Sequence, residues 1–274
     1  MAAKRARSSR RSSAAIPSSA IPRDLRVAVT AGASGIGRVI AEHFAACGAR
    51  VFVCDVDAKA LADLARKRPR IRGMQADVAV EVEVGRFFAA VRKALGGLDV
   101  LVNNAGIAGP TGGVDEIAAA DWDRTVAINL SGQFYCLNRA VPMLKKSKNP
   151  SIIGISSVAG RLGYAFRTPY AATKWAIVGL TKSLAIELGP LGIRANCILP
   201  GIVRGARINR VIEARARTVG VSFAEMEKQY LRKISLRRMV APEDVAATAL
   251  FLCSPAGANI SGQAISVCGN VETL

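Results

Sequence analysis

Residues 26–37 read Arg26-Val-Ala-Val-Thr-Ala-Gly-Ala-Ser-Gly-Ile-Gly37, and this stretch decides the fold of the chain. Its first five residues form a short, largely apolar run typical of a buried strand, and the next seven form a glycine-rich turn. Apolar residues then recur at helical spacing on one face, which consists of Ile36, Val39, Ile40 and Phe44. Gly48 marks the predicted end of that helix. A strand, a glycine-rich turn and a helix in this order are typical of the first unit of a parallel α/β sheet.

The same alternation of apolar runs and amphipathic stretches continues along the rest of the chain. The later predicted strands are 51–55, 71–76, 98–102, 151–156, 193–199 and 264–268. The later predicted helices are 58–67, 81–95, 121–145, 169–188 and 242–253. Strands that are apolar throughout are buried on both faces, and right-handed crossovers between them give a doubly wound parallel sheet. Because no composition shift divides 24–274, the sequence predicts one α/β domain with a Rossmann fold.

The charge balance of the chain is strongly basic. Among 274 residues, 38 are Lys or Arg and 20 are Asp or Glu. Residues 1–23 carry six basic residues and no acidic one, and we expect this segment to be a disordered leader. It has no apolar stretch of a secretory signal, so a transit peptide, a nucleic-acid-binding tail or a misplaced start remain open. The chain has no apolar run long enough to span a membrane, which excludes a membrane protein of the helical class.

The cysteine and histidine content argues against disulfides and zinc. The six cysteines are far apart and form no CxxC pair, so we expect reduced core residues in a cytoplasmic protein. His43 is the single histidine and lies in a predicted helix, which excludes a zinc site built from several histidines. The sequence therefore predicts no metal.

The glycine-rich turn and the helix behind it predict a dinucleotide site. Glycines let the backbone approach a pyrophosphate closely, and a helix amino terminus offers free N–H groups and a positive dipole end. Asp55 ends the second strand, eighteen residues after Gly37, where its carboxylate can accept hydrogen bonds from ribose hydroxyls. That carboxylate would repel a ribose 2′-phosphate, and Ser34 before Gly35 supplies no positive charge. The pattern favours NAD over NADP, although Asp55 could also be only a turn residue.

These motifs resemble those of the short-chain dehydrogenase/reductase family, over roughly residues 25–270. The family pattern Thr-Gly-x-x-x-Gly-x-Gly corresponds to residues 30–37, with Ala31 in place of the first glycine. The family's adenine-contacting aspartate corresponds to Asp77, and Asn103-Asn-Ala-Gly106 matches the motif after the fourth strand. Pro200-Gly201 matches the turn beside the nicotinamide, but the threonine that commonly follows it in the family is missing. The resemblance implies a cofactor held by Thr30, Gly32, Ser34, Gly35, Ile36, Gly37, Asp55, Asp77, Val78, Asn104, Ala105, Gly106, Tyr170, Lys174, Pro200, Gly201 and Ile202.

The catalytic residues of the family are also matched. Tyr170-Ala-Ala-Thr-Lys174 has the YxxxK spacing, Ser157 precedes Tyr170 by thirteen residues, and Asn129 precedes Ser157 by twenty-eight. Hydride transfer from an alcohol also requires that its oxygen lose a proton, and a free tyrosine is a poor base at neutral pH. Lys174 lies one helical turn from Tyr170 and favours the phenolate. The resemblance makes Tyr170 the general acid/base, Ser157 the group that polarises the substrate oxygen, and Asn129 a link from the lysine to solvent.

The segment 204–238 corresponds to the family's substrate lid and carries ten basic residues against three acidic ones. One interpretation is a positive field that attracts an anionic substrate, with Arg204 and Arg207 nearest to the cofactor. The other is a pair of solvated helices with exposed basic faces.

Together these features predict an NAD-dependent dehydrogenase that acts on a secondary alcohol or ketone. A 3-oxoacyl-thioester reductase of the same family is an alternative, and a non-catalytic dinucleotide sensor or a nucleic-acid-binding protein represent other classes. Basic and aromatic residues are not interleaved, which does not favour nucleic acid. By analogy with the family we expect a homo-oligomer, a tetramer or a dimer, formed through helices 121–145 and 169–188. Trp175 and Phe166 could line a pocket near the helix that carries Tyr170, but such residues are more often buried, and we expect them in the core.

Overall fold

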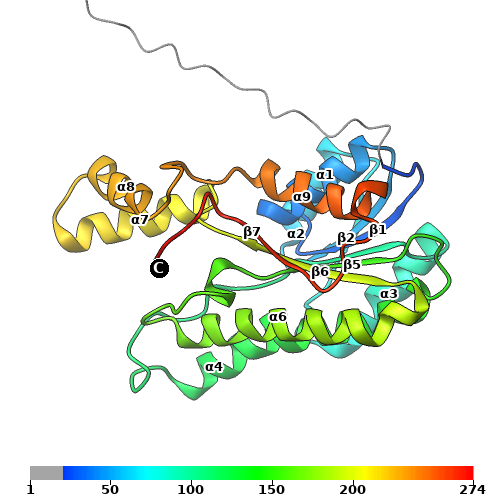
Figure 1. The fold of residues 1–274 in the computed structure, drawn as a ribbon, viewed down its shortest axis with the longest axis horizontal. Helices are drawn as coiled ribbons and strands as arrows, with labels where there is room; N and C mark the ends of the chain where they lie inside the picture. Colours follow the sequence, from blue (N-terminus) through cyan, green and yellow to red (C-terminus); the bar gives the residue numbers. More distant parts are fainter. Residues whose placement is uncertain (1–20, 274) are drawn as a thin grey trace, which may run out of the picture.

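The computed structural model describes residues 21–273, apart from the side chains at 207, 214, 215 and 218, and has a seven-stranded sheet at its centre (Figure 1). The strands are β1 (Arg26–Thr30), β2 (Arg50–Asp55), β3 (Arg72–Gln75), β4 (Val100–Asn103), β5 (Ser151–Ile155), β6 (Arg194–Pro200) and β7 (Ala264–Val267). They lie in the order β3-β2-β1-β4-β5-β6-β7, and all neighbouring pairs are parallel. The predicted doubly wound α/β sheet is confirmed.

Helices cover both faces of the sheet (Figure 1). They are α1 (Gly35–Ala46), α2 (Ala58–Lys67), α3 (Glu81–Leu95), α4 (Ala119–Val126), α5 (Gly132–Leu144), α6 (Thr168–Leu188), α7 (Ala206–Val219), α8 (Phe223–Arg232) and α9 (Pro242–Cys253). One core cluster joins α1, α2 and α9 to the sheet, and the other joins α3, α5 and α6 to the opposite face. Since β1, β2, β4, β5 and β6 are largely buried, each face of the central sheet lies under its own helical layer, whereas β3 at the edge is mostly exposed.

The strand order reverses between β1 and β4, and this position determines where a ligand can bind. The chain moves outward from β1 to β2 and β3, then returns to the other side of β1 and continues through β4 to β7. The register pairs Thr30 with Cys54 and Asn103 with Gly154, so the carboxyl ends of these strands meet at one edge. In open α/β sheets, ligands bind in the crevice outside this edge, where the crossovers diverge.

The long helix predicted over 121–145 is interrupted. Between α4 and α5 the backbone makes a π-helical turn, η2 (Ala127–Ser131), so one helical path contains three segments. The sequence pattern does not reveal this turn, because its residues, Ala127-Ile-Asn-Leu-Ser131, include no glycine or proline that would mark a break. Turns of this kind are common at functional sites, and Asn129 lies at the centre of this one.

The amino-terminal boundary differs from the expected one. Ile21 is only 2% exposed and, with Leu25, belongs to the core under α1 and α9. The folded domain therefore includes residues 21–23, which the sequence assigned to the leader, because an apolar residue there finds a place in the core. The rest of the predicted leader, residues 1–20, lies outside the described residues. Within 21–273 no helix is long and apolar enough to cross a membrane.

The cysteines are free thiols, and four of the six are buried: Cys54, Cys136, Cys197 and Cys253. Burial raises the pKa of Cys54 and of Cys253 to about 12, so both thiols are protonated and unreactive at neutral pH. Cys47 and Cys268 are only partly buried, so the prediction of a core position is wrong for these two.

Two aromatic residues expected in the core are exposed. Trp175 on α6 is half exposed, and Phe166, just before α6, is exposed further. Trp175 lies on the outer face of α6, away from the sheet, and Phe166 has a backbone φ of +61° that turns its side chain outward. Large aromatic side chains on an outer face are available for contacts with another molecule.

Candidate active site

The ends of β1 and β4 are joined by the hydroxyl of Thr30. This fully buried oxygen accepts hydrogen bonds from the backbone N–H groups of Asn104 and Ala105, both at 2.9 Å. The Asn104 side chain donates back to the carbonyl oxygens of Thr30 at 2.9 Å and Ala31 at 3.1 Å. The two motifs that sequence resemblance assigns to the cofactor are therefore bonded to each other.

Three glycines shape the turn after β1. A Cβ at Gly32 would lie 2.7 Å from the side chain of Val53, and one at Gly37 would collide with the Ala31 carbonyl and the Asn104 amide. These two glycines pack the turn against its neighbours. Gly35 differs, because it has a φ of +53° and open space within 4 Å of its Cβ position. The turn is thus closed toward the sheet and open outward, as a site for a pyrophosphate requires.

The amino terminus of α1 is available for an anion. Ser34 makes no side-chain capping bond, and the first turn contains no acidic residue. The N–H groups and the positive end of the helix dipole are therefore not neutralised by the protein itself. Together with the open space at Gly35, this arrangement fits the phosphates of a dinucleotide.

Asp55 lies at the end of β2 and is nearly fully buried. One carboxylate oxygen accepts from the Ala33 N–H at 3.1 Å, and the other accepts from the Asp57 N–H at 3.1 Å. The carboxylate is therefore fixed against the glycine-rich turn. Each oxygen retains a second lone pair, which can accept a hydrogen bond from a ribose hydroxyl.

The other predicted cofactor residues border the same edge of the sheet. Asp77 accepts from the Ala79 N–H at 2.9 Å. Val78 packs closely against Gly132, since a Cβ built on Gly132 would lie 2.8 Å from the Val78 side chain. On the far side of the crevice, Gly201 donates to the Val267 carbonyl at 3.0 Å. The Ile202 carbonyl accepts from Val240, also in the backbone, at 2.9 Å.

Tyr170 and Lys174 lie on the first turns of α6, next to the ends of β4 and β5. The Lys174 ammonium is 5.6 Å from the ring centre of Tyr170 and donates to the Ile155 carbonyl at 3.0 Å. Lys174 is only 4% exposed. Its ammonium faces the motif after β4, because a Cβ built on Gly106 would lie 3.4 Å from the Lys174 Nζ. Ser157 follows β5, and its Oγ accepts from the Ala159 N–H at 3.2 Å.

Asn129 bonds to three groups around the catalytic residues. Its Oδ1 accepts from the Ile107 N–H at 2.7 Å, and its Nδ2 donates to the Ile107 carbonyl at 3.0 Å and to the Thr173 hydroxyl at 3.1 Å. The π-helical turn, the loop after β4 and the catalytic helix are fixed relative to one another by this one amide.

The predicted lid consists of α7 and α8, which lie together at the left of Figure 1. They pack on each other through a small cluster of Ile212, Ala216 and Met226. Arg204 precedes α7 and is exposed, while its backbone N–H donates to the Val240 carbonyl at 2.8 Å. The side chain of Arg207 lies outside the described part, so Arg204 and Arg207 remain predictions.

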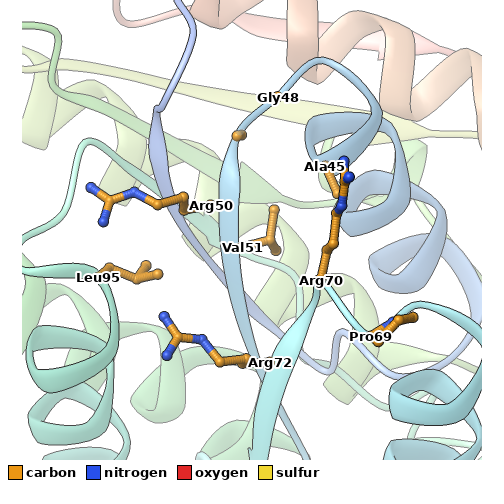
Figure 2. Close-up of a pocket in the computed structure, with 9 residues that line it drawn as sticks. Ala45, Gly48, Arg50, Val51, Pro69, Arg70, Arg72 and Leu95 are labelled. Carbon is orange, nitrogen blue, oxygen red and sulfur yellow. The ribbon is translucent and has the colours of Figure 1, made fainter.

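A second hollow, of about 380 Å³, lies at the opposite, amino-terminal edge of the sheet and contains Arg50, Arg70 and Arg72 (Figure 2). Arg72 donates to the Ala94 carbonyl in the last turn of α3. In Figure 2, Arg50 and Arg72 both extend on the side of Leu95, whereas Arg70 extends toward Ala45. These are the carboxyl ends of α3 and α1, whose negative dipole ends attract cations. The arginines there complement the helices and belong to no cofactor site.

The family profile described as enoyl-(acyl carrier protein) reductase matches residues 30–270. The chain belongs to the short-chain dehydrogenase/reductase family. The hydroxy(phenyl)methylsuccinyl-CoA dehydrogenase subunit BbsD of Thauera aromatica is 34% identical over 88% of this chain and 94% of its own. D-beta-hydroxybutyrate dehydrogenase of Rhizobium meliloti is 31% identical, over 88% and 96%. A crystal structure of an actinorhodin polyketide ketoreductase with NADPH has a TM-score of 0.86 at 32% identity, over 92% of this chain and 98% of that one.

Sequence reasoning missed two residues of this short-chain dehydrogenase/reductase site. Thr173 binds Asn129, and Arg167 contacts the ring of Tyr170 with its guanidinium carbon 5.6 Å from the ring centre. Arg167 precedes Tyr170 by three residues, one helical turn, so its position was a usable signal. Its contact depends on how the backbone enters α6, which hydrophobic spacing does not report.

Ala31, which replaces the first glycine of the family motif, has a φ of +47°. A left-handed conformation costs a residue with a Cβ about 1–2 kcal/mol. Replacing it by glycine removes this strain, but glycine loses more chain entropy on folding, which offsets about half of the stabilisation. We therefore expect Ala31→Gly to stabilise the protein by about 0.5–1 kcal/mol, or roughly 1–4 °C in Tm. Ala33→Gly is the control, because Ala33 is buried without a positive φ and its replacement should lower the Tm. Thermal unfolding measures both, and a lower Tm for Ala31→Gly would show that the turn is not strained.

Proposed function

We propose that this short-chain dehydrogenase/reductase is an NAD-dependent dehydrogenase that interconverts a secondary alcohol and a ketone. The observation that carries the proposal is the buried Lys174, whose ammonium is 5.6 Å from the ring centre of Tyr170. Both residues lie on α6, at the edge of the sheet that also holds an uncapped helix terminus and an open glycine turn, and Gly160, three residues after Ser157, packs against the Lys174 carbonyl. Few other reactions need a buried lysine beside a tyrosine at a dinucleotide crevice.

The chain's own residues handle the proton and the orientation. When bound, the nicotinamide accepts or supplies the hydride. In oxidation, the Tyr170 oxygen removes the proton from the substrate hydroxyl, and in reduction it returns one to the ketone oxygen. The Ser157 hydroxyl donates to the same substrate oxygen. It lies just after β5, and its oxygen accepts a long hydrogen bond of 3.2 Å from the Ala159 N–H, which leaves its own proton to donate. The Lys174 ammonium faces the tyrosine ring, 5.6 Å from its centre.

Replacing Tyr170 by Phe removes the proton-transferring oxygen and leaves the ring. We expect kcat to fall by roughly 10²–10⁴-fold with the Tm and NADH binding unchanged, as for the loss of a general acid/base. Tyr135→Phe on α5 removes a hydroxyl remote from the crevice and serves as the control. NADH absorbance with a panel of secondary alcohols measures turnover, and NADH fluorescence measures binding. Unchanged turnover in Tyr170→Phe, or an absence of turnover together with intact NADH binding, would favour a dinucleotide sensor.

Two observations support NAD over NADP as the cofactor. The buried Asp55 carboxylate is fixed where the ribose hydroxyls of the adenosine would bind. Arg38, the first arginine of α1, already donates to Glu42 at 2.9 Å and to Asp63 at 2.8 Å. A 2′-phosphate would therefore meet a negative charge at Asp55 and find this cation already paired.

Replacement of Asp55 by Asn removes the charge while retaining an oxygen for the turn. We expect kcat/KM for NAD⁺ to fall about tenfold and the preference for NAD⁺ over NADP⁺ to narrow at least as much, because repulsion of the phosphate is relieved. Asp57→Asn, two residues away, retains its capping oxygen at the start of α2 and should leave the preference unchanged. Initial rates with both cofactors provide the test. An equal loss with NAD⁺ and NADP⁺ would contradict a role in selection.

The observations restrict the choice of substrate less than they restrict the choice of cofactor. The names of two relatives specify a substituted succinyl thioester and a hydroxybutyrate, and a third names a polyketide ketone. We propose a small hydroxy or oxo compound that carries an anionic group. Reduction of a 3-oxoacyl thioester is the second candidate, favoured by the ketoreductase likeness and by the basic lid.

We further propose a homo-oligomer assembled through the outer faces of α5 and α6. Phe134 on α5 is 54% exposed, and on α6 Trp175 and Ile186 are 50% and 81% exposed. Trp175 and Ile186 are eleven residues apart, which places them on one face of the helix. Apolar side chains aligned along an outer face are typical of an interface between subunits.

Ile186→Glu places a charge on this face without touching the core. We expect the molar mass in solution to fall from that of a dimer or tetramer toward that of the 28.8 kDa chain, because burial of an unpaired charge opposes association. Val82→Glu is the control, since Val82 on α3 is 67% exposed and lies on another face. Size-exclusion chromatography with light scattering reports the mass. A wild-type monomer, or an unchanged assembly in Ile186→Glu, would contradict the proposed interface.

A further inference from the structure

Arg167 lies at the entrance of the catalytic helix and connects it to the loop after β4. Its Nη1 donates to the Thr111 hydroxyl at 3.2 Å, and its Nη2 donates to the Ala108 carbonyl at 2.7 Å. The preceding residue, Phe166, has a φ of +61°, and its carbonyl accepts from the Gly112 N–H at 3.0 Å. A bulky residue in this left-handed conformation costs about 1–3 kcal/mol and is found where the structure requires one orientation. Here the ring of Phe166 is exposed to solvent, and the next residue, Arg167, lies against the rings of Tyr164 and Tyr170.

The guanidinium lies between two tyrosine rings. Its carbon is 5.5 Å from the ring centre of Tyr164 and 5.6 Å from that of Tyr170. The two rings meet edge to face at 6.5 Å, so the tyrosines and the arginine form one packed group. Contacts with two rings fix the plane of the guanidinium and reduce the entropy that it would lose on binding a ligand.

Arg167 retains donors and charge that the protein does not match. Its Nε is buried and has no hydrogen-bond partner, and two of the five N–H groups of a guanidinium account for its bonds to the loop. Within residues 21–273 it forms no ion pair, whereas Arg26 and Arg38 each bind a carboxylate. A buried N–H without a partner costs about 1–3 kcal/mol, which favours a ligand that accepts from it.

We propose that Arg167 binds a carboxylate of the substrate and so selects a short hydroxy acid or oxo acid. This inference rests on the proposed dehydrogenase function and names the substrate class of that site. Since the guanidinium carbon is 5.6 Å from the ring centre of Tyr170, a substrate that reaches both the tyrosine and the arginine has its carboxylate close to its reacting carbon, which favours a short acid. The planar guanidinium can donate to both carboxylate oxygens, which fixes the orientation of the substrate. The selecting charge thus belongs to the catalytic helix and not to the lid.

A purely structural role for Arg167 predicts a different result. If the side chain only anchors the loop through Thr111 and Ala108, its loss disturbs charged and neutral substrates equally. If it binds a carboxylate, its loss affects only substrates that carry one. Matched pairs of an acid and its methyl ester separate the two cases, because they differ in charge and share the reacting carbon.

The experiment compares the full-length wild type with Arg167→Gln, Arg167→Lys and Thr111→Val, after their Tm values have been checked. Arg70→Gln, at the remote edge of the sheet, is the matched control for loss of an arginine. The probes are racemic 2-hydroxybutyrate and 3-hydroxybutyrate with their methyl esters, with NAD⁺ in excess. We expect the wild type to prefer an acid over its ester by about tenfold or more in kcat/KM. Arg167→Gln should abolish that preference, because KM rises for the acid and much less for its ester.

Two further variants separate carboxylate binding by Arg167 from its anchoring of the loop after β4. Arg167→Lys retains a charge and should preserve part of the preference, and Thr111→Val removes one loop contact and should preserve it in full. A parallel loss for acid and ester in Arg167→Gln, or a loss of preference in Thr111→Val equal to that in Arg167→Gln, would overturn the proposal.

A binding measurement separates failure of this inference from failure of the proposed function. Butyrate and malonate are added to the protein with NADH, and the shift in Tm is compared between wild type and Arg167→Gln. A shift in the wild type that is lost in the variant supports carboxylate binding even if no alcohol is oxidised. Turnover of neutral alcohols alone, with no carboxylate-induced shift, overturns the inference and leaves the dehydrogenase function intact.

Discussion

The site depends on the hydrogen bonds made by one buried hydroxyl, that of Thr30. It lies at the end of β1, where the sheet reverses its strand order, and accepts N–H groups from two successive residues after β4. A hydroxyl oxygen has two acceptor lone pairs, and both are used here. Crossovers leave β1 and β4 toward opposite faces, so nothing in the sheet ladder itself fixes the turns that follow them. The Thr30 oxygen supplies that constraint and aligns the glycine-rich turn with the motif beside Lys174.

Asn129 extends the same constraint from the sheet to the catalytic helix. Its amide bonds both backbone groups of Ile107, just after the motif fixed by Thr30, and also bonds Thr173 in the middle of the YxxxK segment. On a regular helix, the direction of an asparagine side chain is fixed by the position of the residue in the turn. The extra residue per turn of the π-helical segment rotates Asn129 relative to the apolar residues on either side, so the amide points inward while the core pattern continues. A continuous chain of hydrogen bonds therefore runs from β1 through β4 to α6.

The sequence predicts the sheet and its helices well because each depends on strong and local signals. Three helices, α2, α3 and α9, have the bounds that were expected from apolar spacing and from Pro242. The π-helical turn was not predictable, since it changes the direction of a polar side chain without changing the apolar pattern. Trp175 was assigned to the core because an apolar residue on a helix is usually buried, and spacing alone does not distinguish a core from a subunit face. The position of Arg167 depends on the left-handed backbone at Phe166, and no sequence rule predicts that conformation for phenylalanine.

The two basic regions near the crevice differ in what they can contribute to recognition. The lid carries a large excess of positive charge, but Arg204 and its other described arginines are exposed, so water and salt weaken their field beyond about 10 Å. Such a field raises the rate at which an anion arrives and does little to discriminate its shape. Arg167 is one charge, but it is partly buried, held in plane by two rings and bonded to the loop by two of its nitrogens. A fixed donor in a less polar environment discriminates between ligands by geometry, because a misplaced carboxylate loses both its hydrogen bonds and its hydration. On the proposed function, the lid would act on association, while selection between similar alcohols would depend on Arg167 beside Tyr170.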